Sequence, residues 1–168
     1  MTGKPSAEHL RYPLHQLYFY LTDACNLSCR HCWIEPDRIR KDRAQSALSA
    51  DLFAAILDQA EPLGTKTVKL TGGEPLLHPR ITDLLDTIQL RRLRLTVETN
   101  GTLCSRELAG KIGACENAFV AVSLDSAAAA LHDWIRGKTG SFDSAVAGIG
   151  NLVAAGLKPQ IIMTLMKR

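Results

Sequence analysis

Short apolar runs alternate along the chain with longer stretches in which apolar residues recur every three or four positions. This alternation is typical of strands and helices that follow one another. The runs that predict buried strands are 17–21, 67–70, 93–99, 118–124 and 160–165. Because apolar residues dominate most of these runs and a helical stretch follows each of the first four, the sequence predicts a parallel sheet packed against helices.

Four helical stretches are predicted between these strands. Ser49, Ser105 and Ser141 are expected to cap the first, third and fourth helices. Pro79 is expected at the first position of the second helix, and residues 132–137 are expected to form a loop before the last one. The apolar stripes of the first and last helices are Leu52, Phe53, Ile56, Leu57 and Ala60, and Phe142, Val146, Ile149, Leu152 and Val153.

Glycine, cysteine and polar residues gather where the first four predicted strands end. The segments are 25–32 with three cysteines, 71–75 with the sequence T-G-G-E-P, 98–101 with E-T-N-G, and 123–125 with S-L-D. Ligand sites of parallel α/β folds lie at the carboxyl ends of the strands. The sequence therefore predicts one site at this edge of the sheet.

Composition narrows the class of protein. Of the 168 residues, 46% are apolar and 22% are charged, which is the balance of one globular domain and not of a disordered chain. A formal net charge of +3 is too small to indicate a nucleic-acid partner. No apolar run is long enough to cross a membrane, and the first 15 residues do not resemble a signal peptide, so we expect a cytoplasmic protein.

The cysteines carry the most specific signal. Cys25, Cys29 and Cys32 form a C-x3-C-x2-C group, whereas Cys104 and Cys115 stand apart and are expected to be small buried residues. One interpretation is a zinc site completed by His9 or His15, although structural zinc sites usually take two separated pairs of ligands. The other is an iron–sulfur cluster, in which three cysteines leave one iron open to a small molecule.

Taken singly, the other motifs are ambiguous. The glycines Gly72 and Gly73 would let the backbone approach a ligand closely, or would form an ordinary turn. Ser123 and Asp125 lie on the same side of a strand end and could bind a ribose or an amino acid, or could form a local turn. Arg136 could bind a carboxylate or face solvent. The dinucleotide and P-loop glycine motifs do not occur in the sequence.

Together, these motifs resemble those of the radical S-adenosylmethionine (radical SAM) enzymes. C25-N-L-S-C29-R-H-C32 is similar to the family's cysteine signature, and T71-G-G-E-P75 is similar to its second motif. The segments 123–126, 132–137 and 140–142 resemble the subgroup that modifies peptides or processes haem precursors, whose SPASM-like members carry extra clusters. The implied fold is a partial (βα) TIM-like barrel with parallel strands and about five of the family's six βα units.

The resemblance also implies a chemistry and a set of site residues. Cys25, Cys29 and Cys32 would ligate a [4Fe–4S] cluster whose fourth iron binds S-adenosylmethionine (SAM). The residues implied to hold SAM are His31, Gly72, Gly73, Glu74, Pro75, Asn100, Ser123, Asp125 and Arg136. Reductive cleavage of SAM would yield a 5′-deoxyadenosyl radical that abstracts hydrogen from a peptide or protein, or from a tetrapyrrole precursor.

Further expectations concern partners and domain limits. A ferredoxin- or flavodoxin-type electron donor is implied, with no nucleic acid and no membrane as partner. We expect an extension at 1–16, followed by a radical SAM core at 17–168 that lacks its last strand and forms part of a longer enzyme. The alternative hypotheses are a non-catalytic zinc- or cluster-binding module and an inactive truncated fragment.

Overall fold

The computed structural model describes residues 12–34 and 47–166, so most of the predicted extension at 1–16 lies outside the described residues. The strands are β1 (Gln16–Tyr20), β2 (Thr67–Thr71), β3 (Arg94–Thr99), β4 (Glu116–Ser123) and β5 (Gln160–Ile162). The helices are α1 (Ala50–Ala60), α2 (Ile81–Leu90), α3 (Arg106–Gly113), α4 (Ala129–Arg136) and α5 (Ser141–Ala154). Two short 3-10 turns, η2 (Glu61–Leu63) and η3 (Pro75–Leu77), follow α1 and β2.

The five strands form one parallel sheet in the order β1-β2-β3-β4-β5. Each strand is added beside the previous one and the order never reverses. That is the progression of a barrel wall, whereas a doubly wound sheet changes direction at a switch point. The prediction of a parallel, partial (βα) barrel is therefore confirmed.

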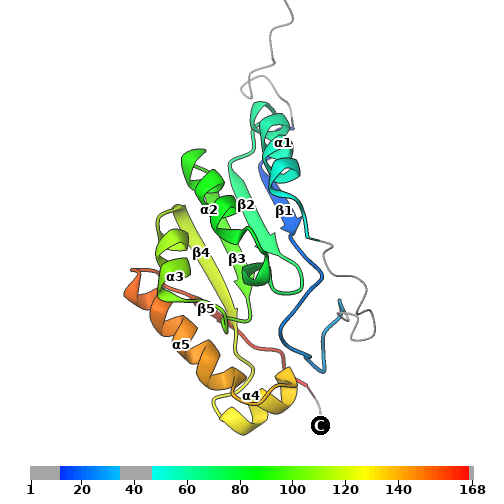
Figure 1. Ribbon diagram of the computed structural model, residues 1–168, viewed down its shortest axis with the longest axis vertical. Coiled ribbons are helices and arrows are strands. Elements are labelled where there is room, and N and C mark those ends of the chain that lie inside the picture. The colour runs from blue at the N-terminus through cyan, green and yellow to red at the C-terminus, as the bar shows by residue number, and fades with distance from the viewer. Residues whose placement is uncertain (1–11, 35–46, 167–168) are drawn as a thin grey trace, which may run out of the picture.

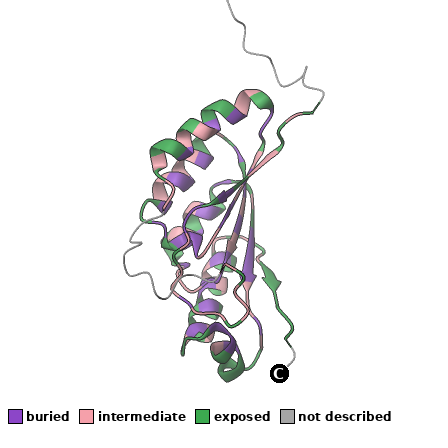
Figure 2. Ribbon diagram, turned by 90° about the vertical axis from the view of Figure 1, so that its right-hand side faces the viewer, coloured by how far each residue is buried: buried purple, intermediate pink, exposed green. Residues whose placement is uncertain are grey.

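The helices pack on one face of the sheet, as Figures 1 and 2 show. The alternation along β3 explains why, because Leu95, Val97 and Thr99 are buried while the residues between them are not. The core formed there also contains Phe53 and Leu57 of α1. Burial of these side chains is the main source of stability for such a layer.

The other face of the sheet carries partly exposed polar and aromatic side chains. Tyr18, Lys69 and Phe119 occupy one row across the register of β1 to β4, and Tyr18 and Phe119 remain exposed. Lys69 Nζ lies 2.5 Å from a Glu98 carboxylate oxygen and 5.0 Å from the centre of the Tyr18 ring. No helix among the described residues covers this open face (Figure 2).

Three predicted element boundaries are wrong. Residues 132–137 are not a loop, because Ala129–Arg136 forms α4 and ends at Gly137, whose φ is 68°. The N-cap of α5 is Gly140 and not Ser141. The capping acceptor comes from α4, since the Asp133 carboxylate accepts hydrogen bonds from Gly140 N, Ser141 Oγ and Phe142 N. Helix α2 begins at Ile81, two residues after Pro79.

The stripes and the last strand also differ in detail from the prediction. Ser49 and Ser105 cap α1 and α3 as expected. Leu52 of α1 and Val146 and Val153 of α5 are exposed, because each lies at the border of its apolar stripe. The last strand is shorter than predicted, since only Gln160–Ile162 pairs with β4.

Candidate functional site

The site predicted at the strand ends lies at the lower end of the molecule in Figure 1. The loop after β1, which carries the three clustered cysteines, runs along this edge and reaches α4. Ser28 N donates to the Arg136 carbonyl and Arg30 N to the Ile135 carbonyl. At Gly137 a side chain would place its Cβ 2.3 Å from the Ser28 carbonyl oxygen. These contacts dock the cysteine loop on the end of α4.

The two glycines of the T-G-G-E-P turn bring a second segment against the same loop. Gly73 N donates to the Thr22 carbonyl and Glu74 N to the Ala24 carbonyl, each at 2.8 Å. A Cβ at Gly73 would lie 2.2 Å from the Ala24 carbonyl oxygen, and one at Gly72 would lie 2.5 Å from that of Thr22. The close approach that glycine permits here is therefore between two loops of the protein itself.

Glu74 is the polar centre beneath the turn. Its side chain is fully buried and accepts hydrogen bonds from Leu76 N, Thr99 Oγ1 and Asn100 N at 2.7–3.0 Å. Burial raises the pKa of Glu74, and these three bonds oppose the rise. The carboxylate ties the ends of β2 and β3 together, so any contact of Glu74 with a ligand is left to its backbone.

Asn100, at the end of β3, connects this centre to the cysteine loop. Its Nδ2 donates to Asn26 Oδ1 at 2.9 Å and lies 3.9 Å from Cys25 Sγ. Its Oδ1 accepts from the backbone N–H and the hydroxyl of Thr102. Asn26 in turn donates to the Thr102 hydroxyl at 2.8 Å. This closed ring of hydrogen bonds fixes the orientation of the Asn100 amide.

Arg136, at the end of α4, connects the cysteine loop to Asp125. Its Nη1 lies 3.6 Å from Cys29 Sγ, within hydrogen-bonding range for sulfur. Its Nε is 2.7 Å from Asp125 Oδ2, and because these two atoms are not aligned as donor and acceptor, the contact is ionic. The other Asp125 oxygen accepts from Thr164 N at 3.0 Å. Both side chains of the pair are almost fully buried.

The pKa values of Cys25 and Cys29 depend on burial, on the neighbouring sulfurs and on nearby charged groups. Burial raises the pKa of the Cys25 thiol, and Glu74 and the other two sulfurs raise it further, against the hydrogen bond from Leu27 N. Burial also raises the pKa of Cys29, while the Arg136 guanidinium beside it acts in the opposite direction. Arg136 therefore favours the anionic sulfur that a metal requires.

The donor set fits an iron–sulfur cluster better than a zinc ion. Within 12–34 and 47–166, no three His, Cys, Asp or Glu side chains are arranged to hold one metal ion, whereas a cubane cluster takes its thiolates at separate irons. His15 precedes β1, about 16 Å of strand away from the cysteine loop, so it cannot complete a zinc site there. His9, the other zinc ligand considered, lies outside the described residues.

The remaining predicted residues lie at the same edge. His31 is half-buried in the cysteine loop, and its Nδ1 is buried with no hydrogen-bond partner within the described part of the chain. Ser123 is the last residue of β4 and is half-buried, and Pro75 begins η3. Asn26 and Thr102 were missed by the sequence analysis. The only sequence signals for them are that Asn26 follows Cys25 and that Thr102 follows the pair Asn100-Gly101.

Cys104 and Cys115 are buried in the core, as predicted. Burial raises the pKa of each thiol to about 11. At pH 8 about one molecule in a thousand then carries the thiolate, which is the form that reacts with alkylating agents.

Alkylation should therefore separate the two groups of cysteines. When the native, iron-free chain is treated with iodoacetamide at pH 8, we expect the three loop cysteines to be modified and Cys104 and Cys115 to stay unmodified, as read by peptide mass mapping. In denaturant all five should react. Equal rates for Cys104 and the loop cysteines in the native chain would contradict the burial described above.

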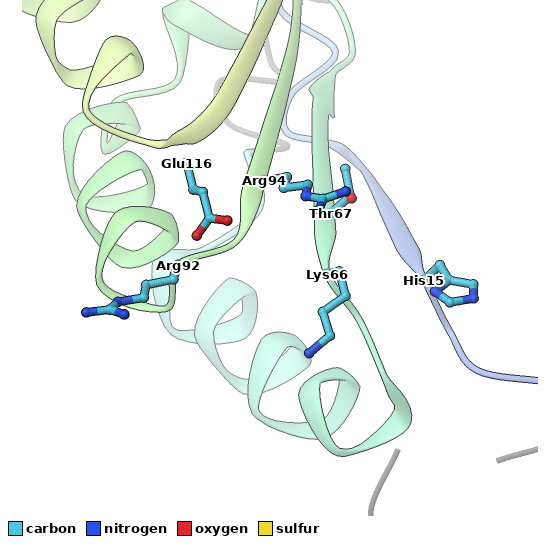
Figure 3. Close-up of a pocket in the computed structure, with 6 residues that line it drawn as sticks. All are labelled: His15, Lys66, Thr67, Arg92, Arg94 and Glu116. Atoms are coloured by element: carbon cyan, nitrogen blue, oxygen red, sulfur yellow. The ribbon is translucent and has the colours of Figure 1, made fainter. Parts of the chain in front are cut away.

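A separate pocket of about 580 Å³ opens at the amino ends of the strands, opposite the cysteine loop. It is lined by His15, Lys66, Thr67, Arg92, Arg94 and Glu116. Figure 3 shows Arg92 and His15 on opposite sides of it, so its charges do not converge on one point. Neighbouring Arg91 is paired with Asp58 and Glu61. Arg92 and Arg94 are exposed to solvent, so we assign no ligand to this pocket.

The sequence of this chain is similar to those of known proteins. The profile of the Radical SAM superfamily matches residues 19–168. Mycofactocin maturase MftC of Mycobacterium tuberculosis is 36% identical over 151 residues, which cover 88% of this chain and 37% of that protein. Fe-coproporphyrin III synthase of Methanosarcina barkeri is 31% identical over 148 residues, which cover 88% and 36% of the two chains. The chain thus spans little more than a third of these relatives.

A solved structure shows the same fold. SuiB of Streptococcus suis, crystallised with S-adenosylmethionine, superposes with a TM-score of 0.77 over 94% of this chain and 35% of its own, at 22% identity. The family profile and the relatives agree with the motifs, and they support the radical SAM interpretation over the zinc-binding alternative. The superfamily uses a [4Fe–4S] cluster and SAM. The chain belongs to the radical SAM superfamily.

Proposed function

We propose that the protein binds a [4Fe–4S] cluster and SAM at the carboxyl edge of its sheet and modifies a peptide substrate by hydrogen abstraction. The observation that carries this proposal is the convergence of the cysteine loop, the T-G-G-E-P turn and Arg136 at that edge. When bound, the cluster and SAM supply a 5′-deoxyadenosyl radical able to attack an unactivated carbon. The chain's own residues bind, orient and shield these groups.

In this proposal Cys25, Cys29 and Cys32 hold the cluster. Their loop is docked by backbone hydrogen bonds to α4 and to the turn after β2. These two sets of contacts hold the cysteine loop in position when no metal is bound. A preformed ligand set lowers the entropic cost of binding the cluster.

The SAM contacts fall into two groups. The backbone of the Gly72–Pro75 turn, Ser123 and Arg136 would bind the amino and carboxylate groups of its methionine part, and His31 would contact the nucleoside part. Glu74 and Asp125 act differently, because their buried oxygens are engaged by protein groups. They hold Asn100 and Arg136 in position.

The peptide is the substrate class best supported by the relatives. A precursor peptide is bound to SuiB in one crystal structure, and the mycofactocin maturase is a relative at 36% identity. The open face of the sheet, with Tyr18, Lys69, Glu98 and Phe119, leads to the cysteine loop and offers aromatic and charged contacts to a chain laid along it. A tetrapyrrole precursor is the alternative, favoured by the 31% identity to a coproporphyrin synthase.

Two further elements complete the proposal. A low-potential, one-electron donor of the ferredoxin or flavodoxin type would reduce the cluster. The cytoplasm is the compartment expected for an enzyme whose free thiols and cluster require reducing conditions. No helix of the described residues is both long and apolar enough to span a membrane.

Anaerobic reconstitution tests the proposal. With iron and sulfide the chain should turn brown, and with dithionite and SAM it should release 5′-deoxyadenosine. Cys29→Ala is expected to lower cluster content and product by at least about tenfold, because it removes one of three thiolates. Cys115→Ala, the matched control, should retain both. A colourless chain that binds one zinc ion would refute the proposal, and a brown chain that releases no product would indicate an inactive cluster-binding fragment.

A further inference from the structure

Two of the three clustered cysteines have a nitrogen donor beside their sulfur. Arg136 Nη1 lies 3.6 Å from Cys29 Sγ, and Asn100 Nδ2 lies 3.9 Å from Cys25 Sγ. The donors come from different elements, since Asn100 follows β3 and Arg136 ends α4. Both are almost fully buried, at 7% and 6% exposure, so water competes little for these contacts.

Each donor is held by a buried carboxylate. Asp125, whose side chain is 0% exposed, pairs with Arg136 Nε at 2.7 Å. Glu74, also 0% exposed, accepts from Asn100 N at 2.8 Å. The Asn100 amide is fixed further by Asn26 and Thr102. The fold thus keeps a cation beside Cys29 and an amide beside Cys25 without depending on a ligand.

We propose that Arg136 and, more weakly, Asn100 tune the reduction potential of the cluster bound by this loop. The inference rests on the proposed function, because it assumes that the three cysteines hold a [4Fe–4S] cluster. One-electron reduction by an external donor adds one negative charge to the cluster and its thiolates, and no proton or bond changes place. A donor or a cation near a sulfur stabilises the reduced form more than the oxidised form and raises the potential.

Arg136 carries most of the effect for two reasons. It is charged, and its contact with sulfur is shorter than that of Asn100. Its buried position also weakens screening by solvent and salt. This role is separate from binding the SAM carboxylate, because it acts on the cluster when SAM is absent.

The test is a redox titration without SAM, in which the electron paramagnetic resonance signal of the reduced cluster is followed in the reconstituted full chain. At the potential where the unmodified chain is half reduced, Arg136→Gln is expected to lower the ratio of reduced to oxidised cluster about tenfold. For one electron this equals a shift of about 59 mV to lower potential. Arg136→Lys keeps the charge but not the planar fork, so its shift should have the same direction and a smaller size.

Arg30→Gln is the matched control. Arg30 follows Cys29 directly, but its Nε donates to the Trp134 carbonyl and its guanidinium lies 4.2 Å from the Trp134 ring centre. Its exposed charge is screened, so we expect less than about a threefold change in the same ratio. Equal potentials for the unmodified chain, Arg136→Gln and Arg136→Lys would overturn the inference alone. Failure of the unmodified chain to assemble a cluster would overturn the proposed function and the inference with it.

Discussion

Replacing Gly73 with alanine is expected to lower the free energy of unfolding by about 3 kcal/mol, because the new Cβ would overlap backbone and disrupt nearby hydrogen bonds. That carbon would lie 2.2 Å from the Ala24 carbonyl oxygen and 2.7 Å from that of Asp23. Backbone atoms cannot rotate away as a flexible side chain can, so the loops must separate. The bonds from Gly73 N to Thr22 and from Glu74 N to Ala24 would then lengthen or break.

Urea unfolding of the iron-free chain measures this loss, and iron content after reconstitution measures its effect on the site. Gly150→Ala is the matched control, since a Cβ there meets nothing within 4 Å and the residue lies inside α5. Alanine is expected to stabilise that helix by about 0.5–1 kcal/mol. If Gly73→Ala were as stable as the parent chain and took up as much iron, the described packing of the two loops would be wrong.

Replacing Glu74 with alanine should be similarly damaging for a different reason. The Leu76 and Asn100 backbone N–H groups and the Thr99 hydroxyl would lose their common buried acceptor. Each unsatisfied buried donor costs about 1–3 kcal/mol. Because the variant no longer buries a carboxylate, part of this cost is offset. We therefore expect the free energy of unfolding to fall by about 3 kcal/mol. This is a large part of the 5–15 kcal/mol that stabilises a typical domain.

The pH dependence separates this cause from simple loss of packing. Burial raises the pKa of Glu74 in the folded chain, so the folded state holds the proton more tightly than the unfolded state. The stabilisation that comes from this proton is therefore fully present below about pH 4.3, the pKa of a glutamate in the unfolded chain. It declines as the pH rises through the pKa of Glu74 in the folded chain. The difference in stability between the parent chain and Glu74→Ala should be larger at about pH 5 than at about pH 8.

Glu98→Gln provides the control for Glu74→Ala. Glu98 lies near the end of the neighbouring strand β3, but its side chain is 39% exposed and paired with Lys69. Exposed ion pairs contribute about 0–1 kcal/mol, so this variant should unfold at nearly the same urea concentration as the parent. If Glu74→Ala behaved like Glu98→Gln, Glu74 would not be the polar centre of the site.

The sequence predicted most of the architecture because its signals are local. Apolar runs located all five strands within a few residues, and Ser49 and Ser105 capped the helices they were expected to cap. Helix α4 was missed because its polar residues and flanking glycine are equally typical of a loop. Its function in the fold is tertiary, since Asp133 caps the next helix and the Arg136 carbonyl receives the cysteine loop.

For the site, the sequence located the segments but not the direction of their side chains. The spacing of the three cysteines and the T-G-G-E-P turn was enough to indicate the family and its cofactors. Glu74 and Asp125 were predicted among the residues that hold SAM. In the folded chain their carboxylates are buried against protein donors, and only the packing of β2, β3 and α4 could show this.

By itself, the sequence determined the order of strands and helices, the edge of the sheet at which the motif residues lie and the family to which the chain belongs. These follow from periodicity and from spacing within short segments. Only the tertiary structure decided that the glycines of the second motif seat one loop on another, and that Arg136 and Asn100 stand beside the sulfurs of Cys29 and Cys25. The physical reason is that such contacts join residues 49 to 107 positions apart, and their geometry exists only once the sheet has brought its strand ends together.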